Sequence, residues 1–144
     1  MSKKKAIRIV LWLFLFGLIL AFSTIFYMFN MPRRNVATEK AIYSLDAKQL
    51  ISEFKKDETS ANAKYLDKAI SVTGEIKGIR TLDNQSIVYS LEDVMEGVSC
   101  TVDSADVLSF ASRLKTIKTG SKATFKGRCS GMLMDIQIIN SVPE

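Results

Sequence analysis

The two cysteines are the side chains best able to do chemistry in this chain. Cys100 lies in "GVSCTVD" and Cys129 lies in "KGRCSG", and the sequence contains no histidine. A Cys-His or Ser-His nucleophile therefore cannot be built from this chain, which also lacks the side chain best suited to general base catalysis at neutral pH. Two thiols without a histidine or a close Cys-x-x-Cys pair cannot complete a tetrahedral zinc site. We therefore expect no metal, no cofactor and no enzymatic activity.

Two pairs of adjacent acids are the other candidates for catalysis. Asp57 and Glu58 lie at the end of a predicted helix, and Glu92 and Asp93 lie at the end of a predicted strand. Carboxylates in such positions usually serve as turn and solvation residues. A glycine-rich phosphate-binding loop is not predicted either, because the glycines around Cys129 flank a hairpin rather than a strand-to-helix junction.

An apolar segment near the N-terminus predicts a membrane anchor. Residues 9–29, "IVLWLFLFGLILAFSTIFYMF", carry no charge, and a helix of this length, rising about 1.5 Å per residue, spans a bilayer core of roughly 30 Å. The surplus of basic residues before this segment favours a cytoplasmic N-terminus and an extracytoplasmic remainder, periplasmic or at the cell surface. The alternative is a secretory signal cleaved after residue 23, in "AFS". We favour an anchor because apolar residues continue to Phe29.

Charge separates the anchor from the rest of the chain. Six of the 20 basic residues flank the apolar segment, which leaves 14 basic and 15 acidic residues and a net charge of −1 for the remainder. The overall charge of +5 thus reflects membrane topology rather than a nucleic-acid-binding surface. Between Asp106 and Asp135 the chain has basic residues and no acid, which predicts a solvated face or, alternatively, contact with an anionic partner or lipid headgroups. This basic run consists of Arg113, Lys115, Lys118, Lys122, Lys126 and Arg128.

The chain after the anchor predicts two helices and five strands. Asp46 can cap a helix over residues 47–57, and helical spacing predicts another over residues 105–117. Gly74 interrupts the inward positions of the first strand, which predicts a bend that lets this strand serve two sheets. Alternating apolar residues predict the strands, over residues 69–79, 86–92, 98–103, 122–129 and 133–140. The positions in phase on these strands include Ile70, Val72, Ile76, Tyr89, Leu91, Val98, Cys100, Val102, Phe125, Cys129, Met134, Ile136 and Ile138.

This order of elements suits a mainly β fold, a five-stranded Greek-key barrel of the OB type. One helix lies between strands 3 and 4, another precedes the barrel, and a single transmembrane helix precedes both. A sandwich fragment and an open sheet packed by two helices remain as alternatives. The predicted organisation is a cytoplasmic basic N-terminus at 1–8, the anchor at 9–29, a linker at 30–42 and an OB-fold domain at 43–144.

The chain after the anchor also resembles a known family. The stretches "DAKQLISEFKKDETSANAKYLDKAISVTGEI", "GVSC" and "KTGSKATFKGRCSG" are similar to those of the tRNA-anticodon-binding-like OB-fold family, small bacterial proteins that are membrane-anchored or secreted. The resemblance covers about residues 43–140 and is most specific in the "F…DE…AN…Y" run into "VTGEI" and in the "KGRCSG" turn. It implies an OB fold and no particular biochemical activity.

The cysteines can now be interpreted. Cys100 and Cys129 fall on the inward phase of their strands, and the predicted topology places them outside the cytoplasm, where disulfides persist. We therefore predict a disulfide, which in the chain-entropy model would stabilise the barrel by roughly 3–4 kcal/mol. The alternative is two buried free thiols that act as small hydrophobic groups. The usual OB strand order places the fifth strand between the third and fourth, so the required approach of the two Cα atoms is not assured.

The predicted function is binding. We expect a membrane-anchored extracytoplasmic interaction module whose partners are the lipid bilayer, through residues 9–29, and a protein, glycan or small-molecule ligand. OB barrels commonly bind across the second and third strands and the loops after strands one and four. The candidate site residues there are Lys77, Arg80, Tyr89, Thr101, Arg128, Ser130 and Met132. The alternative is an OB domain that binds single-stranded nucleic acid, which we do not expect because the net charge is −1 and most aromatic residues fall on buried phases.

Overall fold

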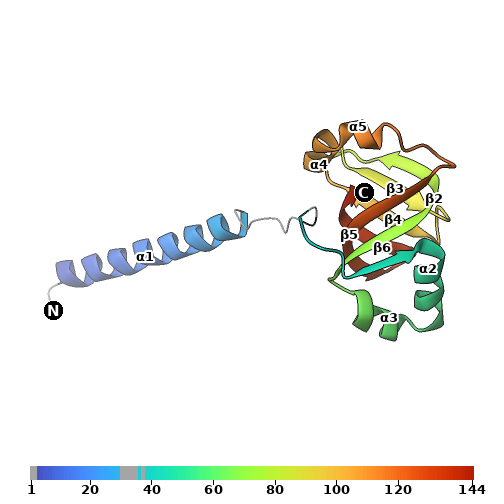
Figure 1. The fold of residues 1–144 in the computed structure, drawn as a ribbon. Helices are drawn as coiled ribbons and strands as arrows, with labels where there is room; N and C mark the ends of the chain where they lie inside the picture. The colour runs from blue at the N-terminus through green and yellow to red at the C-terminus, as the bar shows by residue number, and fades with distance from the viewer. Residues whose placement is uncertain (1–2, 30–35, 37) are drawn as a thin grey trace. The chain divides into compact units, whose positions relative to one another are not determined.

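The computed structural model describes residues 3–29, 36 and 38–144, which belong to two compact units, Met1–Arg34 and Asn35–Glu144. The first unit contains the helix α1 (Lys3–Phe29), and the second contains all the strands of the described chain (Figure 1). Within α1, the stretch Ile7–Met28 has a mean hydropathy of 2.6 and is long and apolar enough to cross a membrane. The predicted apolar helix is therefore confirmed, and by length and composition it fits an anchor or a signal sequence.

The predicted helix before the barrel is present as α2 (Ala47–Lys56). Its N-cap is Asp46, whose side chain accepts a hydrogen bond of 3.0 Å from the backbone N–H of Lys48. Leu50 and Phe54 lie one turn apart and are buried against the barrel core. This amphipathic pattern, visible in the sequence, fixes the helix on the end of the barrel.

A second short helix, α3 (Glu58–Tyr65), follows α2 directly and was not predicted. Asp57 ends α2 and caps α3, because its side chain accepts from the backbone N–H of Ser60 at 3.1 Å. Only Ala61 and Tyr65 of this helix are buried. Two buried positions in eight residues give too weak a helical period to recognise from the sequence.

The remaining elements form a closed barrel, as predicted. The strands lie in the order β1-β2-β3-β4-β6-β5, and an additional pairing of β2 with β5 closes the five strands β2 to β6. The extra strand β1, which was not predicted, pairs parallel with the first part of β2. Figure 1 shows α2 and α3 at one end of the barrel and α4 and α5 at the other. The strands are β1 (Tyr43–Asp46), β2 (Ala69–Thr81), β3 (Ile87–Leu91), β4 (Val98–Val102), β5 (Lys122–Met132) and β6 (Ile136–Pro143).

The long strand β2 changes its neighbours along its length, as expected of a strand shared between two parts of the barrel, while the predicted bend at Gly74 stays a prediction. Its first part, from Ala69 to Glu75, pairs with β5, and its second part, from Ile76 to Thr81, pairs with β3. A register shift between Ile76 and Gly78 marks a bulge in the second pairing. We call the pairing of β2 with β5 the closure seam, because without it the sheet would be open.

The core is formed by the positions predicted to face inward, with one exception. Met134 is 69% exposed because β6 begins two residues later and Met134 lies in the turn before it. The predicted single helix over residues 105–117 is two short helices, α4 (Ser104–Ser109) and α5 (Ala111–Leu114), separated at Phe110. The inward residues with at most 1% exposure are Ile70, Val72, Ile76, Leu91, Val98, Cys100, Val102, Phe125, Cys129, Ile136 and Ile138.

The predicted disulfide is wrong, because Cys100 and Cys129 are free and buried. Cys100 lies on β4 and Cys129 on β5, and the same residue of β6, Ile138, is the register partner of both. Since adjacent strands lie about 4.8 Å apart, a strand between them puts the two Cα atoms about 10 Å apart. A disulfide requires less than about 7 Å. The thiols are therefore small core groups, and burial raises the pKa of each.

The close packing around Gly74 gives a test of the bend in β2. A Cβ atom at Gly74 would lie 2.9 Å from Cβ of Ala47 and 3.2 Å from Cβ of Leu91, whereas one at Gly78 would meet its nearest neighbour, a methyl of Val94, at 3.5 Å. We expect Gly74→Ala to lower the free energy of unfolding by about 1–3 kcal/mol because it overpacks the contact of β2 with α2 and β3. The matched control Gly78→Ala should change it by less than about 1 kcal/mol.

Urea unfolding of the unit Asn35–Glu144 measures both variants. Equal effects at the two glycines would contradict the account of the bend.

Candidate functional site

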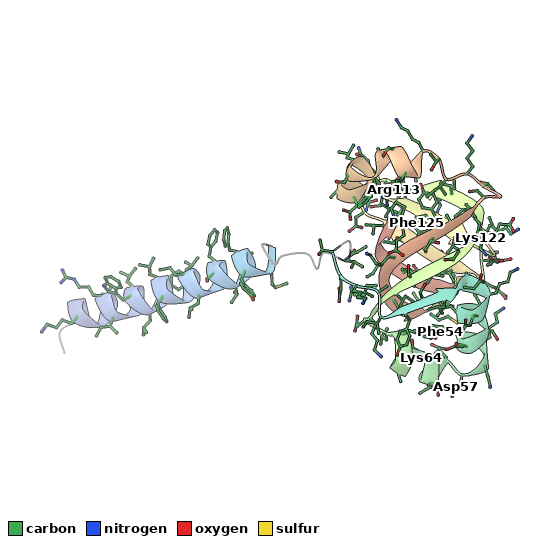
Figure 2. All side chains as sticks on the ribbon, in the orientation of Figure 1. Phe54, Asp57, Lys64, Arg113, Lys122 and Phe125 are labelled. Carbon is green, nitrogen blue, oxygen red and sulfur yellow. The ribbon has the colours of Figure 1, made fainter. Side chains whose placement is uncertain are left out.

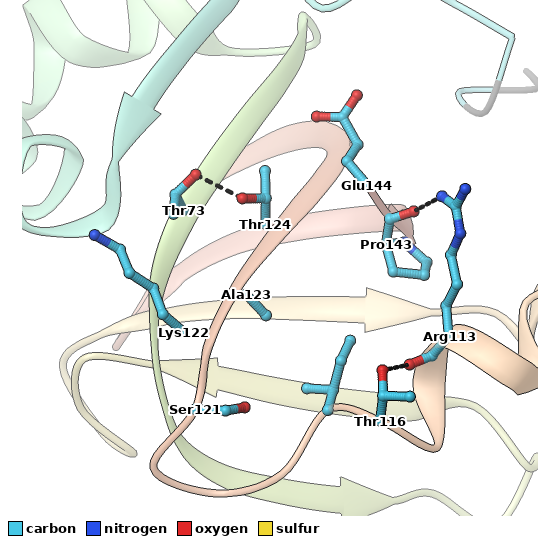
Figure 3. A pocket seen from close by; sticks show the side chains of 10 residues that line it. Thr73, Arg113, Thr116, Ser121, Lys122, Ala123, Thr124, Pro143 and Glu144 are labelled. Atoms are coloured by element: carbon cyan, nitrogen blue, oxygen red, sulfur yellow. Dashed lines mark hydrogen bonds between the residues drawn. The ribbon is translucent and has the colours of Figure 1, made fainter.

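A cavity of about 640 Å³ opens at the closure seam of the barrel. It lies between β2, the first residues of β5, the helix α5 with its following turn, and the last residues of β6 (Figure 3). Its lining combines hydroxyl groups, two basic side chains and one carboxylate with a few apolar groups. The lining residues are Thr73, Arg113, Thr116, Ile117, Ser121, Lys122, Ala123, Thr124, Pro143 and Glu144.

The turn after α5 is held against β2 by backbone hydrogen bonds. The N–H of Gly120 donates to the carbonyl of Ile76 at 2.7 Å, and the N–H of Ile76 donates to the carbonyl of Ser121 at 2.9 Å. Gly120 has φ of +86°, a left-handed conformation that glycine adopts without strain. These contacts fix Ser121 at the edge of the cavity, where its hydroxyl donates to the carbonyl of Lys118 at 2.6 Å.

Hydroxyl groups line the cavity on both sides. Thr73 of β2 and Thr124 of β5 share a hydrogen bond of 2.8 Å across the closure seam, where they are register partners. On the α5 side, the hydroxyl of Thr116 donates to the carbonyl of Arg113 at 2.7 Å. Each of these oxygens keeps acceptor capacity, so the cavity offers several groups that can hydrogen-bond a hydroxylated ligand.

Two cations lie on opposite sides of the cavity. Figure 3 shows Arg113 on one side and Lys122 on the other, with the pair Thr73 and Thr124 and the residue Glu144 between them. Arg113 donates to the carbonyl of Pro143 at 3.3 Å, and the Lys122 ammonium lies 3.7 Å from a carboxylate oxygen of Asp46.

The one carboxylate of the lining is already engaged. Glu144 accepts from the hydroxyl of Ser71 and lies 3.6 Å from the ammonium of Lys126. Because Glu144 is the only acid in the lining, the cavity holds no pair of carboxylates for acid and base catalysis. In the part of the chain that the structure describes, no cluster of three or more His, Cys, Asp or Glu side chains could hold a metal ion.

A smaller cavity of about 280 Å³ lies between α2 and α3. Beside it, the carboxylate of Glu53 accepts hydrogen bonds from Lys64 at 2.9 Å, from the hydroxyl of Tyr65 at 2.7 Å and from Gln49 at 3.0 Å. These bonds lower the pKa of Glu53 from 4.5 to about 2. The polar groups satisfy one another and join the two helices, so we interpret the cluster as structural. Figure 2 shows Lys64 at this end of the domain and Arg113 at the other.

Three of the predicted site residues lie on the outer surface of β2 and β4. Arg80 and Thr101 both have Val88 of β3 as their register partner, so they lie in one row across three strands. Lys77 is exposed and forms an ion pair of 2.7 Å with Glu75. This surface carries polar groups, but its residues line neither of the two cavities described above.

The other predicted site residues lie elsewhere. Tyr89 is only 2% exposed and packs on Phe125 in the core, with 4.8 Å between ring centroids, and burial raises its pKa. Arg128 pairs with Asp67 at 2.7 Å; Ser130 is exposed and Met132 is half-buried at the end of β5. The structure therefore brings Arg80 and Thr101 together and separates Tyr89 from them. A binding role for the seven residues stays a prediction.

The cavity at the closure seam was not predicted from the sequence. Two of its residues, Arg113 and Lys122, belong to the basic run that was interpreted as a solvated face or a contact for an anionic partner. That basic run was the only feature of the sequence that pointed to this site. Nothing in the sequence marked Thr73 or Glu144 as site residues.

The barrel and its insertions define the class of protein. The pairing of β2 with β5 closes five strands, and helices are inserted after β4, the third strand of the barrel. This is therefore an OB-fold protein with an apolar N-terminal helix. Its sequence matches the model of the tRNA_anti-like family over residues 1–142, and the chain belongs to that family.

A solved structure shares this fold. It comes from Klebsiella pneumoniae subsp. pneumoniae MGH 78578 and is described as a "putative nucleic acid-binding lipoprotein". The two superpose with a TM-score of 0.56 at 18% sequence identity, covering 76% of this chain and 94% of that one. At this identity the likeness shows a common fold alone. Comparison with curated protein sequences finds no match.

The Glu53 cluster predicts how stability depends on pH. Because the folded pKa of Glu53 lies near 2, below its ordinary value of 4.5, its stabilising effect is complete above about pH 4.5 and is lost as the pH falls toward 2. We expect Glu53→Gln to lower the free energy of unfolding by about 1 kcal/mol at neutral pH, given the partial exposure of the group. The difference from the parent protein should shrink on acidification through that range.

Urea titrations at several pH values measure this effect, with Asp83→Asn, in the exposed turn after β2, as the control. If the difference in unfolding free energy between Glu53→Gln and the parent protein stays constant from pH 7 to below pH 3, the ionised Glu53 does not stabilise the contact between α2 and α3.

Proposed function

We propose that this protein is a membrane-anchored, extracytoplasmic OB-fold module that binds a small polar ligand at the closure seam and catalyses no reaction. The cavity of about 640 Å³ carries this proposal. Its volume falls within the range of small-molecule sites, roughly 300–1,000 Å³. Its hydroxyl groups lie between two cations, an arrangement that serves recognition of an anionic, hydroxylated ligand.

The side chains of the cavity define the chemical class of the ligand. The guanidinium of Arg113 suits a carboxylate or phosphate group, and Lys122 adds a second positive charge. The hydroxyls of Thr73 and Thr124 suit hydroxyl groups of the same ligand. Glu144 disfavours a ligand with many negative charges. We therefore assign the site to a ligand such as an acidic sugar or a sugar monophosphate.

The absence of catalysis is part of the proposal. The sequence has no histidine, and Glu144 is the single acid in the cavity lining. Both cysteines are buried with raised pKa values, so neither supplies a thiolate nucleophile at the surface.

The N-terminal sequence supports anchoring by α1 and an extracytoplasmic barrel. The stretch Ile7–Met28 can cross a membrane, and four basic residues stand before residue 9, whereas two, Arg33 and Arg34, stand shortly after residue 29. The description of the Klebsiella neighbour as a lipoprotein agrees with a barrel outside the cytoplasm.

Binding of single-stranded nucleic acid is the second candidate function, and the description of the same neighbour favours it. Such binding generally needs exposed aromatic side chains on which bases stack. Here each aromatic residue of the barrel unit is buried or packed against the core. These residues are Tyr43, Phe54, Tyr65, Tyr89, Phe110 and Phe125. With a net charge of −1 for residues 35–144, we place nucleic acid second.

Ligand titration tests the cavity. Glucuronate and glucose 6-phosphate, added to the isotope-labelled unit Asn35–Glu144, should shift the amide resonances of Thr73 and Thr124, whereas glucose should shift them less. Changing both Arg113 and Lys122 to Gln should weaken binding of the acidic sugars by about 10-fold or more, because charged hydrogen bonds are lost. Changing Lys115 and Lys118 to Gln should leave the affinity for the acidic sugars nearly unchanged, because these lysines belong to the same basic run but do not line the cavity.

The competing function has a distinct outcome in the same experiment. Submicromolar, steeply salt-dependent binding of a labelled single-stranded DNA or RNA, abolished by Lys126→Ala with Arg128→Ala, would replace the small-ligand proposal with the nucleic-acid one.

Protease accessibility tests the orientation. Protease added outside intact spheroplasts should digest the barrel, because the basic residues at the start of α1 favour a cytoplasmic N-terminus. Digestion only after the membrane is broken would reverse the proposed topology.

A further inference from the structure

The turn between β5 and β6 carries strongly exposed apolar side chains. Leu133 is 87% exposed and Met134 is 69% exposed, and both lie at the tip of the hairpin. Neither side chain is buried in the core, so polar residues at these positions would leave the packing of the core unchanged. Two adjacent large apolar residues at a loop tip therefore point to a partner surface.

The same end of the barrel receives the chain from α1. The N–H of Ile42 donates to the carbonyl of Ala69 at 2.8 Å, which places the segment after the apolar helix beside the start of β2. The last part of β5 lies there too, because the N–H of Cys129 donates to the carbonyl of Lys68 at 3.0 Å. Ile42 is 58% exposed.

Leu66, at the end of α3, joins this surface. It is 43% exposed, and one of its methyl groups lies 3.4 Å from the Cβ position of Gly131, two residues before Leu133. We call the surface formed by Ile42, Leu66, Leu133 and Met134 the apolar end.

Basic side chains accompany the apolar end. The ammonium groups of Lys64 and Lys68 both lie 5.7 Å from the ring centroid of Tyr43, the residue that follows Ile42. Arg128 lies on the same part of β5, paired with Asp67. Apolar side chains beside lysine and arginine are the composition that binds the interface of an anionic bilayer.

The linker tethers the barrel to the membrane that α1 is proposed to span. Only residues 30–42 separate α1 from β1, and a segment of this length extends at most about 45 Å. A tether so short gives the barrel a high effective concentration at the bilayer surface, so weak contacts suffice for docking.

We infer that the apolar end docks on the surface of the bilayer that α1 spans, with Leu133 and Met134 inserted among the headgroups and Lys68 against the phosphates. This inference rests on the proposed anchoring by α1. It leaves the cavity at the closure seam accessible, because no residue of the apolar end lines it.

A depth measurement on the full chain tests the docking. Leu133→Cys is labelled with a fluorophore and reconstituted into vesicles of phosphatidylcholine and phosphatidylglycerol. Leu108→Cys is the matched control, because Leu108 is 83% exposed on α4 at the opposite end of the barrel (Figure 1). The native cysteines are buried and should remain unlabelled in the folded protein.

Lipids brominated near the headgroup should quench the probe at position 133 several-fold more than the probe at position 108. Met134→Asp, or vesicles without phosphatidylglycerol, should reduce the quenching at position 133. Equal quenching at both positions overturns the inference. So does a position-133 probe that is shielded from aqueous iodide but not quenched by brominated lipid, because a second copy of the chain then covers the surface. Protein that does not float with the vesicles overturns the anchoring as well.

Discussion

Closure of the barrel depends on β2, which pairs with β5 along its first part and with β3 along its second. Both pairings are made by this single strand, which at Gly74 packs closely against Ala47 of α2 and Leu91 of β3. Once both pairings have formed, each neighbour is fixed in register and the inward positions of five strands meet in one core. The closure seam also brings Thr73 and Thr124 together, and the cavity opens beside that pair. Fold and candidate site thus have the same structural origin.

Much of this architecture could be predicted because a strand with one buried face shows its period locally. The alternation around Ile70, Val72 and Ile76 identifies both the strand and its inward face, and a glycine among them indicates the bend. The features that were missed leave little local signal. The strand β1 has four residues, α3 buries two side chains, and the break at Phe110 interrupts a pattern that was helical on both sides. Tertiary contacts define these elements.

The candidate site could be predicted only in fragments. Periodicity identifies which face of a strand is buried but not how far apart two inward residues lie, and the disulfide was predicted from the shared inward phase although the expected OB strand order already separated the strands of Cys100 and Cys129, as β6 does here. The same limit applies to the cavity. Arg113, Lys122 and Glu144 come from three separate parts of the chain, and only closure of the barrel makes them neighbours. Tyr89 was placed among candidate ligands although its alternation with Ile87 and Leu91 already indicated the core.

The two buried thiols have a consequence for how the protein matures. Because no covalent cross-link joins β4 to β5, the barrel reaches its fold through noncovalent packing alone. It needs no thiol oxidase or isomerase, and a change of ambient redox potential leaves its stability as it was. The same fold is therefore accessible in a reducing compartment and in an oxidising one. Burial lowers the thiolate fraction of both cysteines, which also protects the core from reactive oxidants.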